Sequence, residues 1–267
     1  MSDRGGILRE FSPALRERRL VLHFPGFPAA LDGLKLCLVS DLHLRKPTPT
    51  FDELLSYLNT HTFDLACCTG DVAGSWGGTS AASLELARRL FQSSPPRLGW
   101  FAVRGNNDPR PFMRRLARMG VHVLYNEAVR IGGSDPPFYL VGVDDPHYGH
   151  DDLDAALRDV PQDAFKLLLA HSPDVIHNAA RRRVELVLSG HTHGGQIRLP
   201  VIGAVLTQSR VGRRYAWGLA RKGDTLIYTT CGVGWALVPV RFNCPPEVVS
   251  LTLRRGRGPH VDFHAPV

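Results

Sequence analysis

The sequence predicts an α/β fold in which buried strands alternate with amphipathic helices. Short aliphatic runs recur along the chain, each ends in a polar residue, and each is followed by a stretch that is compatible with a helix. Such runs are typical of buried strands, and their alternation with helices is typical of a largely parallel sheet. The length of 267 residues suits one large α/β domain.

The aliphatic runs predict six strands, which cover residues 34–39, 64–69, 99–103, 138–143, 166–170 and 184–188. Amphipathic spacing predicts helices between them, over residues 51–59, 81–91, 111–119, 152–158 and 173–182. In the last third, the runs 215–220 and 225–228 flank a turn at residues 221–224 and predict a hairpin. A closing strand is predicted over residues 247–253.

The composition excludes several other classes of protein. With 43% hydrophobic and 21% charged residues, the chain is globular rather than disordered, collagen-like or coiled-coil. The longest stretch without Asp, Glu, Lys, Arg or His, residues 225–240, is shorter than the ~20 residues that a membrane-spanning helix needs. The first 19 residues lack the apolar run of a signal peptide, and the five cysteines form no CxxC pair, so we expect a cytoplasmic protein with reduced thiols.

The formal net charge of +7 favours acidic partners such as phosphate substrates, anionic lipid or nucleic acid. At the amino terminus, Ile7, Leu8, Phe11 and Leu15 have helical spacing among arginines, a pattern that suits an anionic bilayer. A helix packed on its own domain, or a frayed terminus, explains the same pattern. We therefore expect an amphipathic segment over residues 1–20, one domain over residues 21–267, and peripheral association with the inner membrane as an alternative to a purely cytoplasmic location.

Residues that can bind a metal ion follow the predicted strands. They are Asp41 and His43 in SDLHL, Asp71 in TGDVAG, Asn106 in RGNND, His171 in LLAHSPD, and His191 and His193 in SGHTHGG. In α/β folds, sites form at the carboxyl ends of strands, so these segments would direct their polar residues into one crevice. A lone histidine after a strand is usually a satisfied polar residue, and an isolated Gly-Asp is usually a turn, but five coincident segments are not explained in this way. Imidazole and carboxylate without thiolate suit Mn²⁺, Zn²⁺ or Fe²⁺.

The ordered motifs DxH, GD, GN, AH and GHTH resemble those of the calcineurin-like metallophosphoesterases, and they span Asp41 to His193. The segments GGQIRLP, DDPHYGHDDLDAAL and VPVRFNCPPEV resemble a bacterial subgroup of membrane-associated phosphoesterases, whose relatives include UDP-2,3-diacylglucosamine pyrophosphatases of lipid A synthesis. The family resemblance implies a four-layer α/β/β/α sandwich with two mixed sheets.

The resemblance also implies two divalent metal ions, with Mn²⁺ expected and Zn²⁺ or Fe²⁺ as alternatives. By position, the ligands are Asp41, His43 and His193 for one ion, Asn106, His171 and His191 for the other, and Asp71 as the bridge. Two such ions ~3.5–4 Å apart can activate a shared water and stabilise the attacking and leaving oxygens at phosphorus. Glycines beside these ligands, Gly70, Gly105 and Gly190, would let the backbone turn sharply.

The expected catalytic residues are Asp71, Asn106, Asn107 and His191. At Asn107 the chain departs from the family's usual GNHD motif, in which a histidine steadies the phosphate or protonates the leaving oxygen. Because asparagine cannot be a general acid, we expect cleavage of diesters or pyrophosphates rather than monoesters. The next residue, Asp108, is interpreted as a helix cap before Pro109.

Two weaker signals have competing interpretations. Arg241 follows the apolar stretch 235–240 and is interpreted either as a contact to a substrate phosphate or as a solvated arginine at a strand edge. His147 and His150 lie in a segment rich in Gly and Asp that would either line the substrate pocket or form a surface loop.

The sequence therefore predicts a dinuclear metal hydrolase of phosphodiester or pyrophosphate bonds. Its expected substrate is a phosphate-containing small molecule or a lipid-linked nucleotide, with UDP-2,3-diacylglucosamine as the specific expectation. A nucleotide or nucleic-acid phosphodiesterase is an alternative that the charge favours, but the basic and aromatic residues are not interleaved as in single-strand binders. A non-catalytic scaffold is a second alternative, but the presence of all seven expected ligands argues against it.

Overall fold

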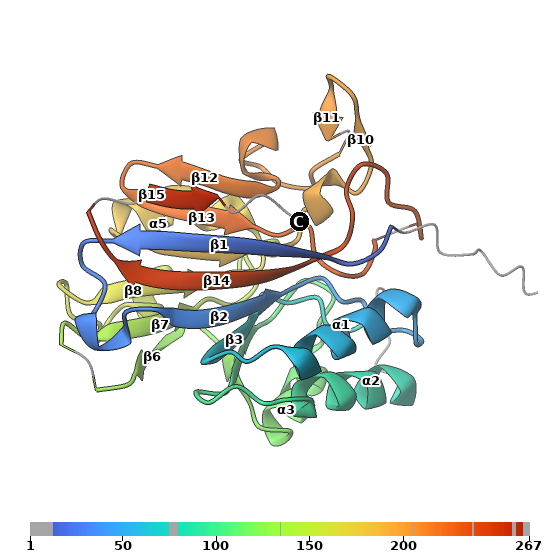
Figure 1. The fold of residues 1–267 in the computed structure, drawn as a ribbon, viewed down its shortest axis with the longest axis horizontal. Coiled ribbons are helices and arrows are strands. Elements are labelled where there is room, and N and C mark those ends of the chain that lie inside the picture. Colours follow the sequence, from blue (N-terminus) through green and yellow to red (C-terminus); the bar gives the residue numbers. More distant parts are fainter. Residues whose placement is uncertain are drawn as a thin grey trace, which may run out of the picture.

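Two mixed β-sheets form the centre of the fold in the computed structural model, which describes residues 13–74, 80–133, 135–204, 206–236, 238–257 and 260–263 (Figure 1). The larger sheet has, in spatial order, β15 (His260–Phe263), β1 (Arg16–Phe24), β14 (Glu247–Arg255), β2 (Leu34–Val39), β3 (Leu65–Cys68), β4 (Trp100–Val103) and β5 (Val121–Leu124). The smaller sheet has β12 (Gly218–Lys222), β13 (Thr225–Thr229), β9 (Leu186–Ser189), β8 (Phe165–Leu169), β7 (Phe138–Gly142) and β6 (Glu127–Ile131). A short hairpin of β10 (Arg198–Leu199) and β11 (Gly203–Ala204) stands apart.

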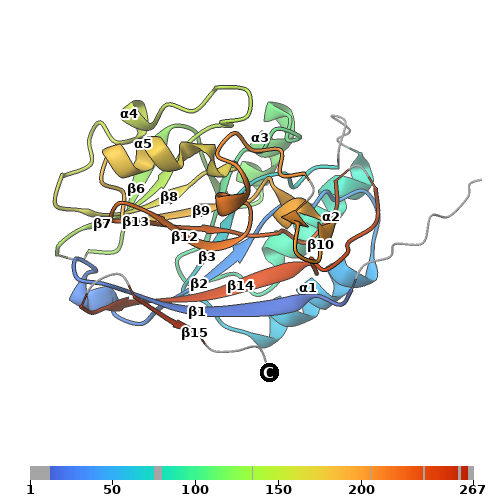
Figure 2. The ribbon, with the colours of Figure 1, turned by 90° about the horizontal axis from the view of Figure 1, so that it is seen from above.

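Helices cover the outer face of each sheet. Hydrophobic side chains of α1 (Pro49–Thr60), α2 (Ala81–Gln92) and α3 (Arg110–Arg118) pack against β2, β3 and β4, and those of α4 (Leu153–Ala156) and α5 (Ile176–Arg181) pack against the smaller sheet. A third core cluster fills the space between the sheets. Figure 2 shows these layers in order from α5 to α1. The predicted four-layer α/β/β/α sandwich is therefore confirmed.

Local sequence explains where the main elements begin. Thr48 accepts a hydrogen bond from the backbone N–H of Phe51, and Pro49 occupies the first position of α1, so this helix has both preferred start signals. Ser80 caps α2 in the same way. The central strands β3, β4, β8 and β9 are buried at every position, which is why they read as continuous apolar runs rather than as alternating ones.

All six predicted strands occur, with ends that differ by at most two residues, and so do the hairpin and the closing strand. The helix predicted over 173–182 divides into a 3₁₀ turn (Pro173–Val175) and α5, and the one over 152–158 shortens to α4. Further single turns of 3₁₀ helix cover Ala29–Leu31, His193–Gly195 and Arg213–Tyr215. The strands β1, β5, β6, β10, β11 and β15 were not predicted.

The prediction of an amphipathic helix at the amino terminus is wrong for those of its residues that the structure describes. Residues 1–12 lie outside the described part of the chain, but Arg16 begins β1, which pairs in parallel with β14 from Arg16 opposite Glu247. Leu20, Leu22 and Phe24 are buried and alternate with less buried neighbours, which is the period of a strand. The sheet thus includes residues that were assigned to an amphipathic terminus.

The helices of the described residues are short, and α1 and α2 have 12 residues each. Within that part of the chain, none combines the length and the hydrophobicity that crossing a bilayer requires.

Candidate metal centre

The seven predicted ligands converge where parallel strands of both sheets end. Asp41 and His43 follow β2, Asp71 follows β3, and Asn106 follows β4 in the larger sheet. From the smaller sheet, His171 follows β8, while His191 and His193 follow β9. The two sheets therefore contribute to one site from opposite sides, as expected for strands whose carboxyl ends meet.

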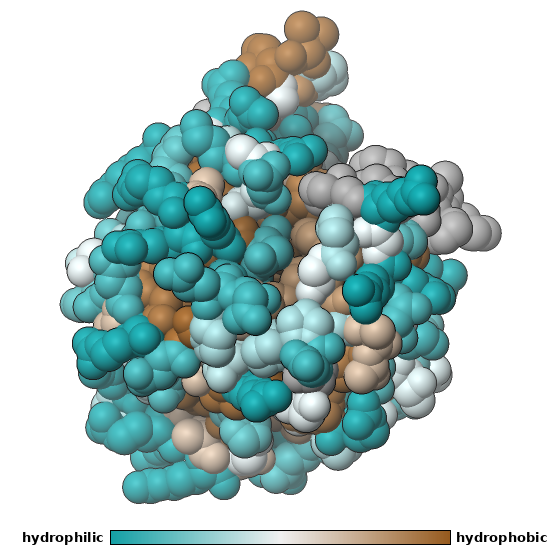
Figure 3. Space-filling view, turned by 90° about the vertical axis from the view of Figure 1, so that its left-hand side faces the viewer, coloured by the Kyte–Doolittle hydropathy of each residue, from teal (hydrophilic) through white to brown (hydrophobic). Residues whose placement is uncertain are grey.

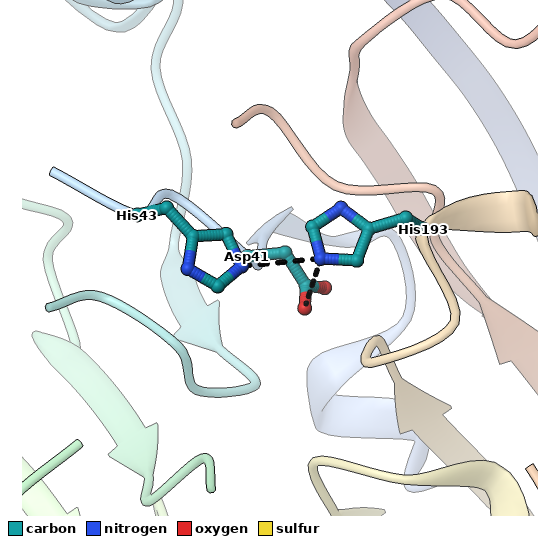
Figure 4. A group of neighbouring side chains, drawn as sticks. All are labelled: Asp41, His43 and His193. Atoms are coloured by element: carbon teal, nitrogen blue, oxygen red, sulfur yellow. Dashed lines mark hydrogen bonds and ion pairs between the residues drawn. The ribbon is translucent and has the colours of Figure 1, made fainter. Parts of the chain in front are cut away.

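One group of possible ligands consists of Asp41, His43 and His193, which are buried and whose ligand atoms all lie within 4.8 Å of one another. The Nε2 atoms of the two histidines are 3.1 Å apart, and Nε2 of His193 is 3.5 Å from Oδ1 of Asp41. Figure 4 shows the three side chains pointing toward one another, Asp41 and His43 from the loop after β2 and His193 from the loop after β9. This grouping is the one that the resemblance implied for the first ion.

Asp71 lies between the two sets of histidines. Its Oδ2 atom is 3.6 Å from Nε2 of His43 and 3.5 Å from Nε2 of His171. A single carboxylate oxygen that faces both sets is the arrangement that a bridging ligand needs. Asp41, Asp71 and His171 form a second buried group within 4.8 Å, so Asp41 lies closer to this half of the site than the sequence indicated.

Asn106 and His191 belong to the second half of the site, because both lie next to His171. Nε2 of His171 is 3.0 Å from Oδ1 of Asn106 and 3.2 Å from Nδ1 of His191. In both histidines, the ring nitrogen that faces away from the other ligands contacts the backbone. Nδ1 of His171 donates to the Thr69 carbonyl, and Nε2 of His191 lies 3.0 Å from the Gln208 carbonyl. Such contacts fix the ring orientation of metal-binding histidines.

The backbone at this site adopts a conformation that non-glycine residues rarely accept. Five of the seven candidate ligands have a positive φ, namely Asp41 (52°), His43 (44°), Asp71 (54°), His191 (70°) and His193 (49°). Each such residue costs free energy, and clusters of them occur at functional sites, where the surrounding structure holds them in place.

Three glycines allow the ligand loops to approach closely, although only Gly70 needs a positive φ, of 97°. A β-carbon at Gly105 would overlap the carboxylate of Asp71, and one at Gly190 would overlap the side chains of Ser40 and Asp41. The expectation of sharp turns therefore holds at Gly70, whereas Gly105 and Gly190 are required for space.

The electrostatics of the site fit divalent cations. Asp41 and Asp71 are fully buried and close together, and burial together with the negative charge of Asp71 raises the pKa of Asp41. Burial alone would lower the pKa of His171, but the charge of Asp71 and its hydrogen bond raise it to about 10. The negative charge of the two carboxylates thus favours a nearby positive charge, which bound divalent cations would supply.

The other three histidines are suited to bind metal because they are neutral. Burial lowers the pKa of His43 to about 4 and, together with the charge of His171, lowers that of His191 to about 3. Burial also holds the pKa of His193 well below its usual value. Neutral imidazole is the form that coordinates a cation, so the donor set fits the expected ions.

Asn107 and Asp108 organise the loop that carries Asn106. Asn107 donates to Asp71 twice, from its backbone N–H to Oδ1 at 2.8 Å and from its amide Nδ2 to Oδ2 at 2.7 Å. The interpretation of Asp108 as a helix cap is wrong. Asp108 is buried and accepts the N–H groups of Ala73 and Gly105, while α3 has no side-chain cap. It joins the loops that follow β3 and β4.

Arg241 is 2% exposed, so its interpretation as a solvated arginine is wrong. Its guanidinium donates to the backbone carbonyls of Cys231, Gly232, Gly234 and Cys244. These bonds hold the loop in which Val233 and Gly234 donate to the carbonyls of Ser40 and Asp41. Contact with a substrate phosphate stays a prediction, and the observed bonds favour a structural role.

His147 lies beside the site, which the competing interpretations of its loop left open. Its ring centroid is 4.9 Å from that of His191, and it lines a cavity with Gln208, Arg210 and Arg213.

His150 instead contacts Arg104 through Nδ1 at 2.9 Å. Arg104, which precedes Gly105, is buried and paired with Asp144 at 2.6 Å. Arg104 was not among the predicted site residues. The signal for it in the sequence is its position directly before the GN motif.

The model of the family described as calcineurin-like phosphoesterase matches residues 34–195 of this chain. Phosphodiesterase YaeI of Escherichia coli is 38% identical over 231 residues, which cover 82% of each chain. The uncharacterized metallophosphoesterase YkuE of Bacillus subtilis is 30% identical over 85% of this chain and 81% of its own. A transmembrane protein with metallophosphoesterase domain of Danio rerio is 29% identical over 85% of this chain and 55% of its own.

The matched region contains β2, β3, β4, β8 and β9 and every candidate ligand. The chain thus belongs to the calcineurin-like phosphoesterases and is a metal-dependent hydrolase of phosphoric esters.

Proposed function

We propose that this protein hydrolyses a phosphodiester or pyrophosphate bond and that the seven candidate ligands hold two divalent ions for this reaction. Mn²⁺ is the expected metal. The observation that carries the proposal is the place of Asp71 Oδ2, which faces His43 at 3.6 Å and His171 at 3.5 Å. The name of the similar Escherichia coli protein, a phosphodiesterase, supports the diester bond as the one cleaved. The intact ligand set supports an enzyme over a scaffold.

Bound ions would supply Lewis acidity toward the phosphoryl oxygens and would lower the pKa of a water molecule. Hydrogen bonds within the chain orient the candidate ligands for this chemistry. Asn107 orients Asp71 by donating to both of its carboxylate oxygens, and the backbone carbonyls of Thr69 and Gln208 orient His171 and His191. Because Asn107 has no acidic proton, protonation of a leaving alkoxide is not among the tasks that it can perform.

A lipid-linked nucleotide is the substrate class that we propose. An apolar pocket of about 190 Å³ lies beside His193 and is lined by Ile197, Leu206, Ala236 and Val238. An apolar lining next to the ligands suits a substrate that carries an alkyl or acyl group near its phosphate. UDP-2,3-diacylglucosamine is the specific compound with which this proposal is best tested.

A panel of substrates tests the proposed function. The protein, stripped of metal and reloaded with Mn²⁺, is incubated with UDP-2,3-diacylglucosamine, a simple aryl phosphodiester, an alkyl phosphomonoester, a cyclic nucleotide and single-stranded DNA, and the products are identified. We expect hydrolysis of the diester or the diacyl nucleotide and none after chelation. Preference for the monoester would contradict the proposed bond type, and preference for DNA would favour the nuclease alternative.

Replacement of Asn107 with histidine should change the preference for leaving groups. An alkoxide leaving group benefits from a general acid by ~10²–10⁴-fold, whereas a phosphate leaving group needs little such help. The Asn107→His variant should therefore raise the ratio of kcat/KM for an alkyl monoester to that for a pyrophosphate by at least ~10-fold. The ratio is the useful measurement, because loss of the hydrogen bond from Asn107 Nδ2 to Asp71 lowers both rates.

The matched control is Asn107→Ala, which removes the same amide donor without adding an acid. Its ratio should stay at the wild-type value even as both rates fall. If the histidine variant also keeps the wild-type ratio, position 107 does not set the leaving-group preference.

A further inference from the structure

A hydrophobic hairpin projects from the body of the protein. The strands β10 and β11 stand at the upper edge of Figure 1, and Figure 3 shows a hydrophobic projection at the same height. The turn between them contains Pro200, Val201 and Ile202, where Val201 is fully exposed at 107% and Ile202 is 56% exposed. Val201 also has a φ of 68°, which is unfavourable for a β-branched residue.

Other exposed apolar side chains gather around this hairpin. Among the described residues, seven of the eight large hydrophobic side chains that are exposed belong to two neighbouring segments, and only Tyr148 lies elsewhere. We call these seven the apolar ridge: Leu199, Val201, Ile202, Leu206, Val238, Val240 and Phe242. Such a concentration on one surface is typical of an interaction site rather than of scattered exposure.

Backbone contacts join the two segments of the apolar ridge. Arg198 donates its N–H to the Phe242 carbonyl at 2.9 Å, and Phe242 donates to the Gln196 carbonyl at 3.0 Å. Gln196 also donates its side-chain amide to the Val238 carbonyl at 2.9 Å. The hairpin is therefore not an independent flap but one surface with residues 238–242.

The chain segments that carry the apolar ridge contain basic but no acidic residues, although Asp174 lines a cavity together with Leu206, Arg210 and Arg213. Residues 186–223 contain no Asp or Glu and carry six cations, Arg198, Arg210, Arg213, Arg214, Arg221 and Lys222. Residues 225–246 also contain no acidic residue. Arg213 is exposed and donates to the carbonyl of Ile202 at the hairpin turn, at 3.3 Å. A cationic base under an apolar projection complements the anionic headgroups and the acyl boundary of a bilayer.

We propose that the apolar ridge inserts into the interface of an anionic phospholipid bilayer while the arginines at its base bind the headgroups. A projecting, narrow ridge suits penetration between lipids better than contact with another protein, whose specific interfaces are broad. The ridge leads directly to the metal centre. Arg198 donates to the Gly194 carbonyl beside His193, and Leu206 and Val238 line the same pocket as His193. Insertion would hold that pocket at the membrane surface, whatever ester the site cleaves.

Vesicle sedimentation tests the proposal with the full chain. We expect binding to vesicles of equal parts phosphatidylglycerol and phosphatidylcholine, weaker binding to pure phosphatidylcholine, and release as salt rises. The double variant Val201→Asp/Ile202→Asp should bind at least ~10-fold more weakly, because each apolar side chain contributes to partition and the new charges oppose it. Arg210→Gln/Arg213→Gln should lose mainly the preference for phosphatidylglycerol.

Insertion can also be observed directly, because all five native cysteines are buried and a new exposed thiol is labelled selectively. A Val201→Cys variant that carries an environment-sensitive dye should show a blue shift with the anionic vesicles, and a dye on Tyr148→Cys should not. Thermal melting and hydrolysis of a soluble diester check that each variant is folded.

Three results would overturn the proposal. The hairpin variants could bind vesicles as the wild type does, or binding could disappear instead in Ile7→Ser/Leu8→Ser, which would assign it to the amino terminus. Alternatively, the wild type could form a dimer that Val201→Asp/Ile202→Asp abolishes, which would make the apolar ridge an interface between copies of this chain.

Discussion

Changing Asp71 to asparagine should lower kcat/KM for the preferred diester about 10³-fold and should leave the purified protein with fewer than two metal ions. Asp71 Oδ2 faces ligands of both halves of the site, at 3.6 Å from His43 and 3.5 Å from His171. An amide has no negative charge and one oxygen fewer, so it cannot attract and bridge two cations. Metal ions contribute several kcal/mol to phosphoryl transfer, and each 1.36 kcal/mol is a factor of ten in rate.

The measurement pairs elemental analysis of the purified variant with its steady-state kinetics. Asp64→Asn is the matched control, because Asp64 precedes the same strand β3 at its opposite end, where it pairs with Arg97. This control should keep both metals and the wild-type rate. Two tightly bound ions in Asp71→Asn, or equal losses in the two variants, would contradict the bridging role.

The ligand set could be proposed from the sequence because each ligand follows a buried strand. Continuous apolar runs mark β2, β3, β4, β8 and β9, and the carboxyl ends of parallel strands meet at one edge of a sheet. The order of the motifs then identified the family. The motifs did not indicate every close neighbour within the ligand set. Asp41, for example, lies in both groups of candidate ligands.

The amino-terminal strand was missed because its pairing is entirely non-local. β1 contacts β14, more than 200 residues away along the chain, and no local turn marks its start. The spacing of Ile7, Leu8, Phe11 and Leu15 favours a helix, but residues 1–12 lie outside the described part of the chain. The alternation that identifies the strand is clear only from Leu20 to Phe24. Period alone cannot separate the two states over so few residues.

The partners of polar residues next to the ligands could not be predicted from the local sequence for a related reason. Asp108 precedes Pro109, which suggests a cap, but the fold brings the N–H of Ala73, 35 residues away, to its carboxylate at 2.8 Å. Likewise, His147 reaches His191 only because the loop after β7 folds over the ends of β8 and β9. Local sequence reports the propensity of a residue, while long-range packing decides its partner.

Replacing Arg241 with alanine should be the most destabilising change outside the ligands. Its buried guanidinium donates to four backbone carbonyls. Hydrogen bonds to a charged group each contribute about 1.5–3 kcal/mol, and water entering the space would replace some of them, so we expect the free energy of unfolding to fall by about 3–6 kcal/mol. Because Val233 and Gly234 donate to the carbonyls of Ser40 and Asp41, the loss should also loosen the first group of ligands.

Urea denaturation of the metal-free protein measures the effect without a contribution from bound ions. Arg221→Ala is the matched control, since Arg221 is exposed and pairs with Asp224, and its stability should change by no more than about 0.5 kcal/mol. Arg241→Lys separates the two roles considered for this residue. Lysine keeps the charge but has no planar fork, so a structural Arg241 predicts a large loss of stability in this variant as well. A variant with wild-type stability and a raised KM would instead identify Arg241 as a contact to the substrate phosphate.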